Sequence, residues 1–353
     1  MGIRRTMLFM FVFIGMLVLA ACGSSESSGD TGQTPGESTN DSDDAVVGET
    51  TVLRMAHLMD TSNVWHITAE KFKEEIETLS EGRYTIEIYP NGEIGTEADM
   101  YQQLGSGNID LMFSSLANLT GSYEEFGAWF VPYLFDNLDQ AYEMGQTDEA
   151  KQILDLVEPD NVVSLGYVLN GMRQLNTVDP VTELSHYQGE RIRVVPSPTI
   201  VDWYNRIGAS PTPMSFGEVF SALQQGVIEG VDNDLTSILS GKHYEVAKHV
   251  TLTNHFAWGG ASLVNADFWN TLSEEDQLLF QEAYANTEAF NVELAKERTD
   301  LDIAELEENG VEIHELENRD EILTLAQEMQ EAYNAESEII AAFIDKGNEI
   351  SGR

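Results

Sequence analysis

The sequence has almost no cysteine. Cys22 is the only one among 353 residues, so no disulfide can form within the chain. Every position after residue 22 lacks a thiol, which excludes a cysteine nucleophile from the main body of the protein. The stability of that body must therefore come from buried side chains, and 42% of the residues are hydrophobic.

Basic residues are scarce as well. The chain carries 18 lysine and arginine residues against 61 aspartate and glutamate residues, which gives a formal net charge of -43. A surface this acidic repels a phosphate backbone, so nucleic acid is excluded as a partner.

Signatures of catalysis are missing from the sequence. It contains no G-x-S-x-G elbow, no glycine-rich phosphate loop followed by lysine and no H-E-x-x-H motif. His243, His249 and His255 are six positions apart, a spacing that does not place them on one face of a helix. The sequence therefore predicts no enzyme, no metal site and no cofactor.

An apolar run from Met7 to Leu19 follows Arg4 and Arg5. It is too short to span a membrane as a helix, and it ends in small residues. This pattern predicts a secretory signal peptide over residues 1–21.

The tetrapeptide LAAC at residues 19–22 resembles the lipobox of bacterial lipoproteins. The resemblance implies cleavage before Cys22 and lipidation of its thiol, which would attach the protein to the outer face of the cell membrane. Residues 22–50 are polar, acidic and rich in Gly and Ser, with almost nothing to bury. We expect them to form a flexible tether.

From residue 51 onward, strand and helix patterns alternate. TVLRMAH (51–57), YTIEIYP (84–90) and IDLMFS (109–114) have the patterns of strands, and helical spacing occurs at 62–80 and 97–104. This order is typical of an α/β protein with a mostly parallel sheet. Such sheets bind ligands beyond the carboxyl ends of their strands.

A second strand and helix series begins with RIRVVPS at residues 191–197. Further on, residues 253–265 predict two strands separated by Gly259 and Gly260. A final amphipathic helix is expected from Arg319 to Phe343.

Two long elements connect these series. Residues 162–177 predict one long strand, and residues 267–310 are almost continuously helical. A helix of about 35 residues is ~50 Å long, which is more than one small domain needs. We therefore expect a clamshell of two α/β domains joined by crossing strands and a long helix, with a ligand in the cleft. The expected first domain comprises 51–170 with about 259–298, and the second comprises 171–258 with about 299–350.

Two arginines in an apolar strand are candidate binding residues. In RIRV, strand alternation places Arg191 and Arg193 on one face and their apolar neighbours on the other. An unpaired buried guanidinium costs several kcal/mol, so a carboxylate must meet it. The planar guanidinium matches a carboxylate with two hydrogen bonds. The residues alone leave both an ion pair between domains and an anionic ligand open.

Residues 187–233, YQGERIRVVPSPTIVDWYNRIGASPTPMSFGEVFSALQQGVIEGVDN, carry a family resemblance. In fixed order they contain a basic R-x strand, GA-x-P-x-P-M, E-V-x-x-A-L-Q-x-G and a final asparagine. GMRQLNT (171–177) and YPNGEIGTEADMYQQLGSGNIDLMF (89–113) fit upstream elements of the same pattern. From about Thr51 onward the chain resembles the extracytoplasmic solute receptors of TRAP transporters, the DctP-type family. Its departures are Glu229 in place of the family's aspartate and Asp232 in place of its glutamate.

The resemblance implies a periplasmic-binding-protein-like clamshell that changes no bond in its ligand. It implies a receptor that binds a small organic acid, such as a dicarboxylate, a hydroxy or keto acid, or a sugar acid. Such a receptor delivers the acid to one small and one large membrane subunit of a TRAP permease. The alternative is a solute-binding or sensor lipoprotein of an ATP-driven importer. A secreted hydrolase or lyase would instead need catalytic groups that face the cleft.

The resemblance also implies a set of ligand-binding residues. Arg193 corresponds to the arginine that anchors the ligand carboxylate, whereas Arg191 is expected to reach solvent or an acid at the rim. The other implied positions are Arg173, Asn233, Phe216, His57 and Ser115. Each of three has an alternative: Phe216 also suits a core, Asn233 a turn or helix cap, and His57 a structural histidine.

Overall fold

The computed structural model describes residues 50–353. These residues belong to one compact unit, Gly48–Arg353. The predicted signal peptide, Cys22 and residues 22–49 of the predicted tether lie outside the described residues. Among the helices of residues 50–353, none is both long and apolar enough to cross a membrane.

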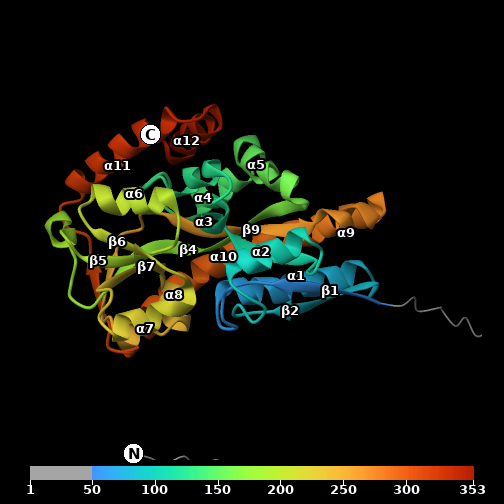
Figure 1. Cartoon of the computed structure of the whole chain (residues 1–353), viewed down its shortest axis with the longest axis horizontal. Helices are drawn as coiled ribbons and strands as arrows, with labels where there is room; N and C mark the ends of the chain where they lie inside the picture. The colour runs from blue at the N-terminus through green and yellow to red at the C-terminus, as the bar shows by residue number, and fades with distance from the viewer. Residues whose placement is uncertain (1–49) are drawn as a thin grey trace, which may run out of the picture. The chain divides into compact units, whose positions relative to one another are not determined.

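The strands of the described residues form one connected sheet in the order β2-β1-β3-β9-β4-β7-β5-β6, to which β8 is added at β4 and β10 at β8 (Figure 1). Pairing is parallel at the outer strands and antiparallel from β3 through β9 and β4 to β7. The α/β class is thus confirmed, although the sheet is mixed rather than mostly parallel, because β4 and β9 run in opposite directions through its centre. The strands are β1 (Thr51–Ala56), β2 (Tyr84–Tyr89), β3 (Leu111–Ser115), β4 (Val162–Thr177), β5 (Arg191–Val194), β6 (Ser210–Pro213), β7 (Gly230–Asp234), β8 (His249–Leu252), β9 (Ala257–Asn265) and β10 (Glu312–Glu315).

The predicted long strand at 162–177 is confirmed as β4. Its residues from Val162 to Met172 pair with β9, and those from Arg173 to Thr177 pair with β7. β4 is therefore shared by a first strand group (β1, β2, β3 and β9) and a second strand group (β5, β6, β7, β8 and β10).

The glycine pair at 259–260 lies inside β9, so the prediction of two strands with a break between them is wrong. A Cβ at Gly260 would lie 2.5 Å from the carbonyl oxygen of Ser114 and 2.6 Å from the ring of Trp65. A Cβ at Gly259 would lie 2.8 Å from the carbonyl oxygen of Val168. These glycines allow close packing within the sheet rather than a turn.

Helices lie on both sides of the strands: α6, α11 and α12 along one side, and α7 and α8 on the other (Figure 1). The α-helices are α1 (Val64–Leu79), α2 (Glu97–Gly105), α3 (Leu116–Leu119), α4 (Leu138–Gly145), α5 (Asp148–Leu154), α6 (Pro198–Arg206), α7 (Val219–Gln224), α8 (Leu235–Ser240), α9 (Ala266–Thr271), α10 (Glu274–Glu308), α11 (Arg319–Asn334) and α12 (Glu338–Ser351). The 3-10 helices are η1 (Glu124–Phe130), η2 (Asp155–Asp160), η3 (Leu184–Tyr187), η4 (Phe216–Glu218) and η5 (His243–Glu245).

Helix α10 connects the two strand groups. It has 35 residues, and it begins after Ser273, whose side chain accepts a hydrogen bond from the backbone N–H of Asp276. It packs against α1 beside the first strand group, against β4, and against α8 and β10 in the second group. The predicted long helix is confirmed, apart from a short break between α9 and α10.

The C-terminal segment forms two helices, so the prediction of one helix from Arg319 to Phe343 is wrong. The chain turns after α11, and the side chain of Ser337 caps α12 by accepting a hydrogen bond from the N–H of Ile339. α12 packs against α4 and α5. The predicted second domain included α12, whereas α4 and α5 belong to the predicted first domain. The boundaries of the two domains therefore stay a prediction.

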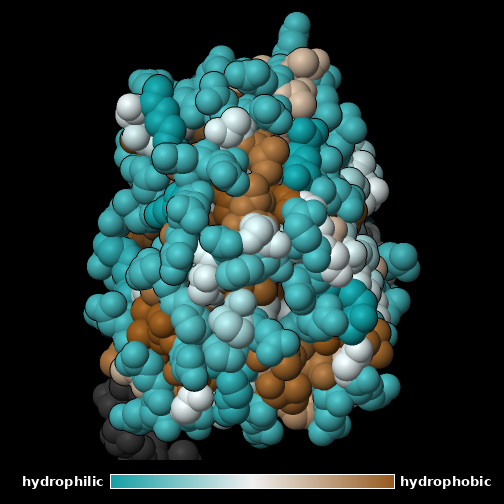
Figure 2. Space-filling view, turned by 90° about the vertical axis from the view of Figure 1, so that its left-hand side faces the viewer, coloured by the Kyte–Doolittle hydropathy of each residue, from teal (hydrophilic) through white to brown (hydrophobic). Residues whose placement is uncertain are grey.

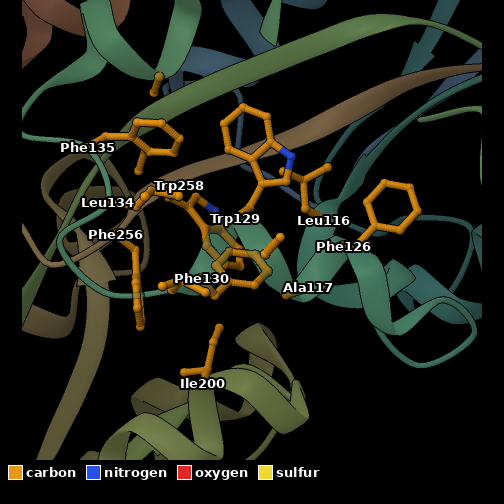
Figure 3. Packing of buried hydrophobic residues seen from close by; sticks show 14 of the residues in the cluster. Leu116, Ala117, Phe126, Trp129, Phe130, Leu134, Phe135, Ile200, Phe256 and Trp258 are labelled. Atoms are coloured by element: carbon orange, nitrogen blue, oxygen red, sulfur yellow. The ribbon is translucent and has the colours of Figure 1, made fainter. Parts of the chain in front are cut away.

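The largest hydrophobic cluster joins parts of the chain that are far apart in sequence. Figure 3 shows rings from η1 and β9 gathered together, with Ile200 of α6 facing them. The ring centroids of Trp129 and Phe343 of α12 are 5.0 Å apart, and those of Phe130 and Trp258 are 5.6 Å apart. By contrast, the face shown in Figure 2 is mostly hydrophilic, with hydrophobic residues in separate patches.

We expect Asn291→Ala to destabilise the protein by about 2 kcal/mol or more. The buried Asn291 side chain of α10 accepts from the N–H of Leu169 at 2.7 Å and donates to the carbonyl oxygen of Leu169 at 2.9 Å. These bonds satisfy the backbone N–H and C=O of Leu169, next to the point where the register of β4 with β9 shifts. Alanine would leave both groups buried without these partners. Urea unfolding followed by circular dichroism measures the change.

The matched control is Asn286→Ala, because Asn286 lies on the same helix but is exposed and donates to the side chain of the partly buried Glu75. That change should alter stability by less than about 0.5 kcal/mol. Equal stability of the two variants would show that Asn291 does not support β4.

Candidate functional site

A cavity of about 480 Å³ lies between the two strand groups. Its lining comes from the segments after β1, β2 and β3, from β4, β5 and β7, from η4 and from β9. This volume is in the range that small-molecule sites occupy.

Arg193 of β5 lines this cavity, and its side chain is only 2% exposed. Ile192 and Val194 point to the opposite face of the strand and are fully buried. Nε and Nη2 of Arg193 donate to the carbonyl oxygen of Met214 at 3.1 and 3.0 Å. Within residues 50–353, no carboxylate oxygen lies within 4.0 Å of its guanidinium nitrogens, so the group has no direct counter-ion in the described protein.

The charge of Arg193 persists despite its burial. Burial and the neighbouring Arg173 lower the pKa of the Arg193 guanidinium to about 9, which still leaves it protonated at neutral pH. The cavity wall therefore carries a positive charge that hydrogen bonds to a carbonyl oxygen do not neutralise.

Arg191, two residues earlier, is in a different environment. Its side chain is about half exposed, and Nη2 lies 2.9 Å from Oε1 of Glu229. It also donates to the carbonyl oxygens of Val227 and Gly226. As the sequence predicts, Arg191 reaches an acid at the surface and does not line the cavity.

Arg173 of β4 also lines the cavity, but it already has a counter-ion. Its Nε donates to Oδ1 of Asp232 at 2.6 Å, and Nη1 donates to Oδ1 of Asn233 at 3.0 Å. Its guanidinium carbon lies 4.2 Å from the centroid of the Trp258 ring, which adds a cation–π contact. Arg173 and Arg193 therefore differ in the feature that matters for binding an anion.

The carboxylate of Asp232 is held in its ionised form. Burial alone raises the pKa of this carboxyl, but its contacts with Arg173 and His255 outweigh that effect and lower it to about 2. Nε2 of His255 lies 3.4 Å from Oδ1 of Asp232. Asp232 thus compensates Arg173 over the whole neutral range.

Asn233 and Phe216 both line the cavity. Asn233 is not a helix cap, since the neighbouring Asp234 caps α8, and Phe216 is half-buried rather than part of the core. Both contact His243: Nδ2 of Asn233 lies 3.4 Å from its Nδ1, and the ring of Phe216 packs edge-on against it. Burial, together with the charges of Arg193 and Arg173, lowers the pKa of His243 to about 3. The imidazole that contacts Asn233 and Phe216 is therefore neutral.

Ser115 and Glu97 both line the cavity and contact each other. Glu97 was not predicted as a site residue from the sequence. The backbone N–H and the hydroxyl of Ser115 donate to the Glu97 carboxylate at 2.6 and 2.9 Å. Burial raises the pKa of the Glu97 carboxyl, against the hydrogen bonds from Ser115. In the sequence, Glu97 has the pattern of an acid in the first turn of a helix, so nothing marked it as a cavity residue.

His57 does not line this cavity, so its expected role as a ligand contact stays a prediction. It is fully buried, and its Nδ1 accepts from the N–H of Met59 while its Nε2 lies 3.2 Å from Nδ1 of His66. Burial and His66 lower its pKa to about 3. Both ring nitrogens are engaged within the protein, as in a structural histidine.

Comparison with known proteins gives concordant matches. A family model described as bacterial extracellular solute-binding protein, family 7 (DctP), matches residues 55–339. The chain is 32% identical to a solute-binding protein of Roseobacter denitrificans over 77% of this chain and 84% of that one. It is 28% identical to the C4-dicarboxylate-binding periplasmic protein DctP of Rhodobacter capsulatus over 82% of this chain and 90% of that one. The crystal structure of the sugar acid binding protein DctPAm from Advenella mimigardefordensis with galactonate has a TM-score of 0.81 to this structure at 25% identity, and it covers 86% of this chain and 99% of that one.

We expect Asp232→Asn to reduce stability by about 3 kcal/mol at neutral pH, since it removes the direct counter-ion of the buried Arg173 and leaves only Asp234, whose Oδ2 lies 3.9 Å from Nη1. The pKa of Asp232 is lowered from 3.8 in the unfolded chain to about 2 in the fold. The contribution of its charge is therefore complete above pH 3.8 and is lost as the pH falls through about 2. Urea unfolding of both proteins between pH 7 and pH 2 measures the difference.

The exposed Asp139 provides the control, because its pair with Lys296 lies at the surface. Asp139→Asn should change stability by less than about 1 kcal/mol. A stability gap between wild type and Asp232→Asn that stays constant down to pH 2 would contradict the assigned charge pair.

Proposed function

This chain belongs to the DctP family, family 7 of the bacterial extracellular solute-binding proteins, and from that premise we propose that it binds a small organic acid through Arg193. Members of the family are extracytoplasmic TRAP-type receptors. They bind solutes and are not enzymes. This chain is accordingly a receptor.

The proposal depends most on the difference between the two arginines of the cavity. Arg173 is neutralised by Asp232, whereas the guanidinium of Arg193 is buried with only a carbonyl oxygen as partner. A buried charge without a counter-ion is unfavourable, and a ligand carboxylate offsets that cost with two charge-assisted hydrogen bonds. Solutes without an anionic group would not offset the free energy cost of the buried Arg193 charge. The cavity is therefore expected to select for acids.

The remaining polar lining supports an acid that also carries hydroxyl groups. The Glu97 carboxylate accepts hydrogen bonds, and Ser115 and Asn233 provide further polar groups in the same cavity. A second carboxylate on the solute would be repelled where it met Glu97, but a hydroxyl could donate to it. We therefore propose a hydroxylated monocarboxylate, such as a sugar acid, and the galactonate complex of the similar receptor supports this class.

Capture of the solute is proposed to involve closure of two lobes. The cavity is lined from both strand groups, and β4 and α10 are the elements that the two groups share. Closure about these elements would bring Phe216 of η4 onto the solute and exclude water from the charge pair with Arg193.

Delivery is proposed to be to a TRAP permease of one small and one large membrane subunit. The LAAC pattern at residues 19–22 supports lipidation of Cys22 after removal of residues 1–21. The tether 22–50 would then keep the receptor at the outer face of the cell membrane, within reach of the permease.

Replacement of Arg193 by Ala tests the site. With galactonate and succinate as the titrated acids, we expect this variant to bind the preferred acid at least about 100-fold more weakly than wild type, because two charge-assisted bonds are lost. Isothermal titration calorimetry measures the affinities, and thermal melting checks that the variant is folded.

Arg191→Ala is the matched control on the same strand, since that side chain pairs with Glu229 at the surface. It should bind within about threefold of wild type, as a surface pair contributes little. Near-normal affinity in a folded Arg193→Ala variant would place the anion site elsewhere, and tighter binding of succinate than of galactonate would favour a dicarboxylate receptor.

A further inference from the structure

Three side chains with metal-binding chemistry meet at the edge of the sheet, where the solute site does not use them. His249 lies on β8, and Glu312 and His314 lie on β10. The strands are parallel, with Glu312 beside His249 and His314 beside Thr251. Positions in register, and positions two apart on one strand, face the same side of a sheet, so the three side chains share one face. None of them lines the cavity.

The potential ligand atoms are already close together. Nδ1 of His249 lies 3.0 Å from Nε2 of His314 and 3.8 Å from Oε2 of Glu312, and one ligand atom from each residue lies within 4.8 Å of the others. In a tetrahedral zinc site with Zn–N bonds of about 2.0–2.1 Å, two nitrogen ligands are about 3.3 Å apart. The two rings would therefore need to separate by only a few tenths of an ångström to accept an ion.

The type of ligand favours a transition metal. Two imidazoles and one carboxylate suit Zn²⁺ and similar ions, whereas Mg²⁺ and Ca²⁺ prefer oxygen ligands alone. The side chain of Glu312 is 71% exposed and that of His249 is 18% exposed, so water can reach the open side of the group. The large negative charge of the chain also attracts cations to its surface.

We propose that His249, Glu312 and His314 form a binding site for one divalent transition-metal ion of the Zn²⁺ type, with water completing its coordination. Sequence spacing cannot show this site, because His314 follows His249 by 65 residues and only the parallel pairing of β8 and β10 brings them together. The competing explanation is a plain hydrogen bond between two neutral imidazoles.

A bound ion would join β10 to β8. β10 is paired only with β8 among the described strands, and it directly follows the long helix α10. The ion would therefore fix the strand to which α10 leads, in the second strand group. This role is independent of the solute that the cavity binds.

Calorimetric titration of Zn²⁺ into the full chain, without an added histidine tag and with excess Mg²⁺ to occupy carboxylate sites, tests the proposal. We expect one Zn²⁺ per chain, with binding weakened at least about tenfold in both His249→Gln and His314→Gln. Zn²⁺ should also raise the melting temperature of wild type and slow amide exchange in β10, with neither effect in His314→Gln. The melting temperatures without metal show that these edge variants fold.

Two control variants make the outcome specific. His186→Gln changes an exposed histidine near Glu183 and should leave Zn²⁺ binding unchanged. His66→Gln disrupts the other close histidine pair, His57 and His66, and should also leave it unchanged. Binding that persists in His249→Gln and His314→Gln, that disappears in His66→Gln, or that wild type lacks altogether would overturn the proposed site.

Discussion

A positive charge is buried at Arg193 with no carboxylate in direct contact among the described residues, and the proposed recognition of an acid depends on this arrangement. Removal of a guanidinium from water is costly unless an anion compensates it. The protein provides compensation for Arg173 through Asp232, but for Arg193 it provides only the carbonyl oxygen of Met214. The folded chain thus retains an unfavourable charge that a ligand can relieve, and the proposed affinity for an acid follows from that relief.

The scaffold makes this arrangement possible by separating the two arginines on different strands. Arg173 lies where β4 leaves the first strand group and pairs with β7, which places it beside Asp232 and Asn233. Arg193 lies on β5, beyond β7. The segment of η4 that follows β6 then brings Phe216 to the same cavity. Because the lining comes from both strand groups, any relative movement of the groups changes how tightly a solute is enclosed.

Long regular patterns were predictable from the sequence, and close packing was not. The strand pattern of 162–177, interrupted by Gly171, and the helical periodicity before Gly310 correctly predicted β4 and α10, because both periodicities extend over many residues. Gly259 and Gly260 resembled a turn, although the rings and carbonyl groups around β9 require glycine for steric reasons. The break between α11 and α12 depends on how α12 packs against α4 and α5, which periodicity does not encode.

The lining of the cavity was predictable where its residues follow a motif. Arg193, Arg173, Asn233, Phe216 and Ser115 were identified from the family resemblance, and all five line one cavity. His57 does not line the cavity, because a position at the end of a strand does not specify which way its ring turns, and in the fold it turns toward His66. Glu97 and Trp258 were missed because a first-turn acid and a strand tryptophan are common in any α/β protein.

A crystal structure of the protein with galactonate or another bound acid tests the contact between Arg193 and the solute carboxylate most directly. The account predicts that the two carboxylate oxygens of the solute accept hydrogen bonds from the guanidinium of Arg193, while Asp232 remains paired with Arg173. A solute carboxylate bound away from Arg193, with that guanidinium paired to a protein aspartate or glutamate, would contradict it.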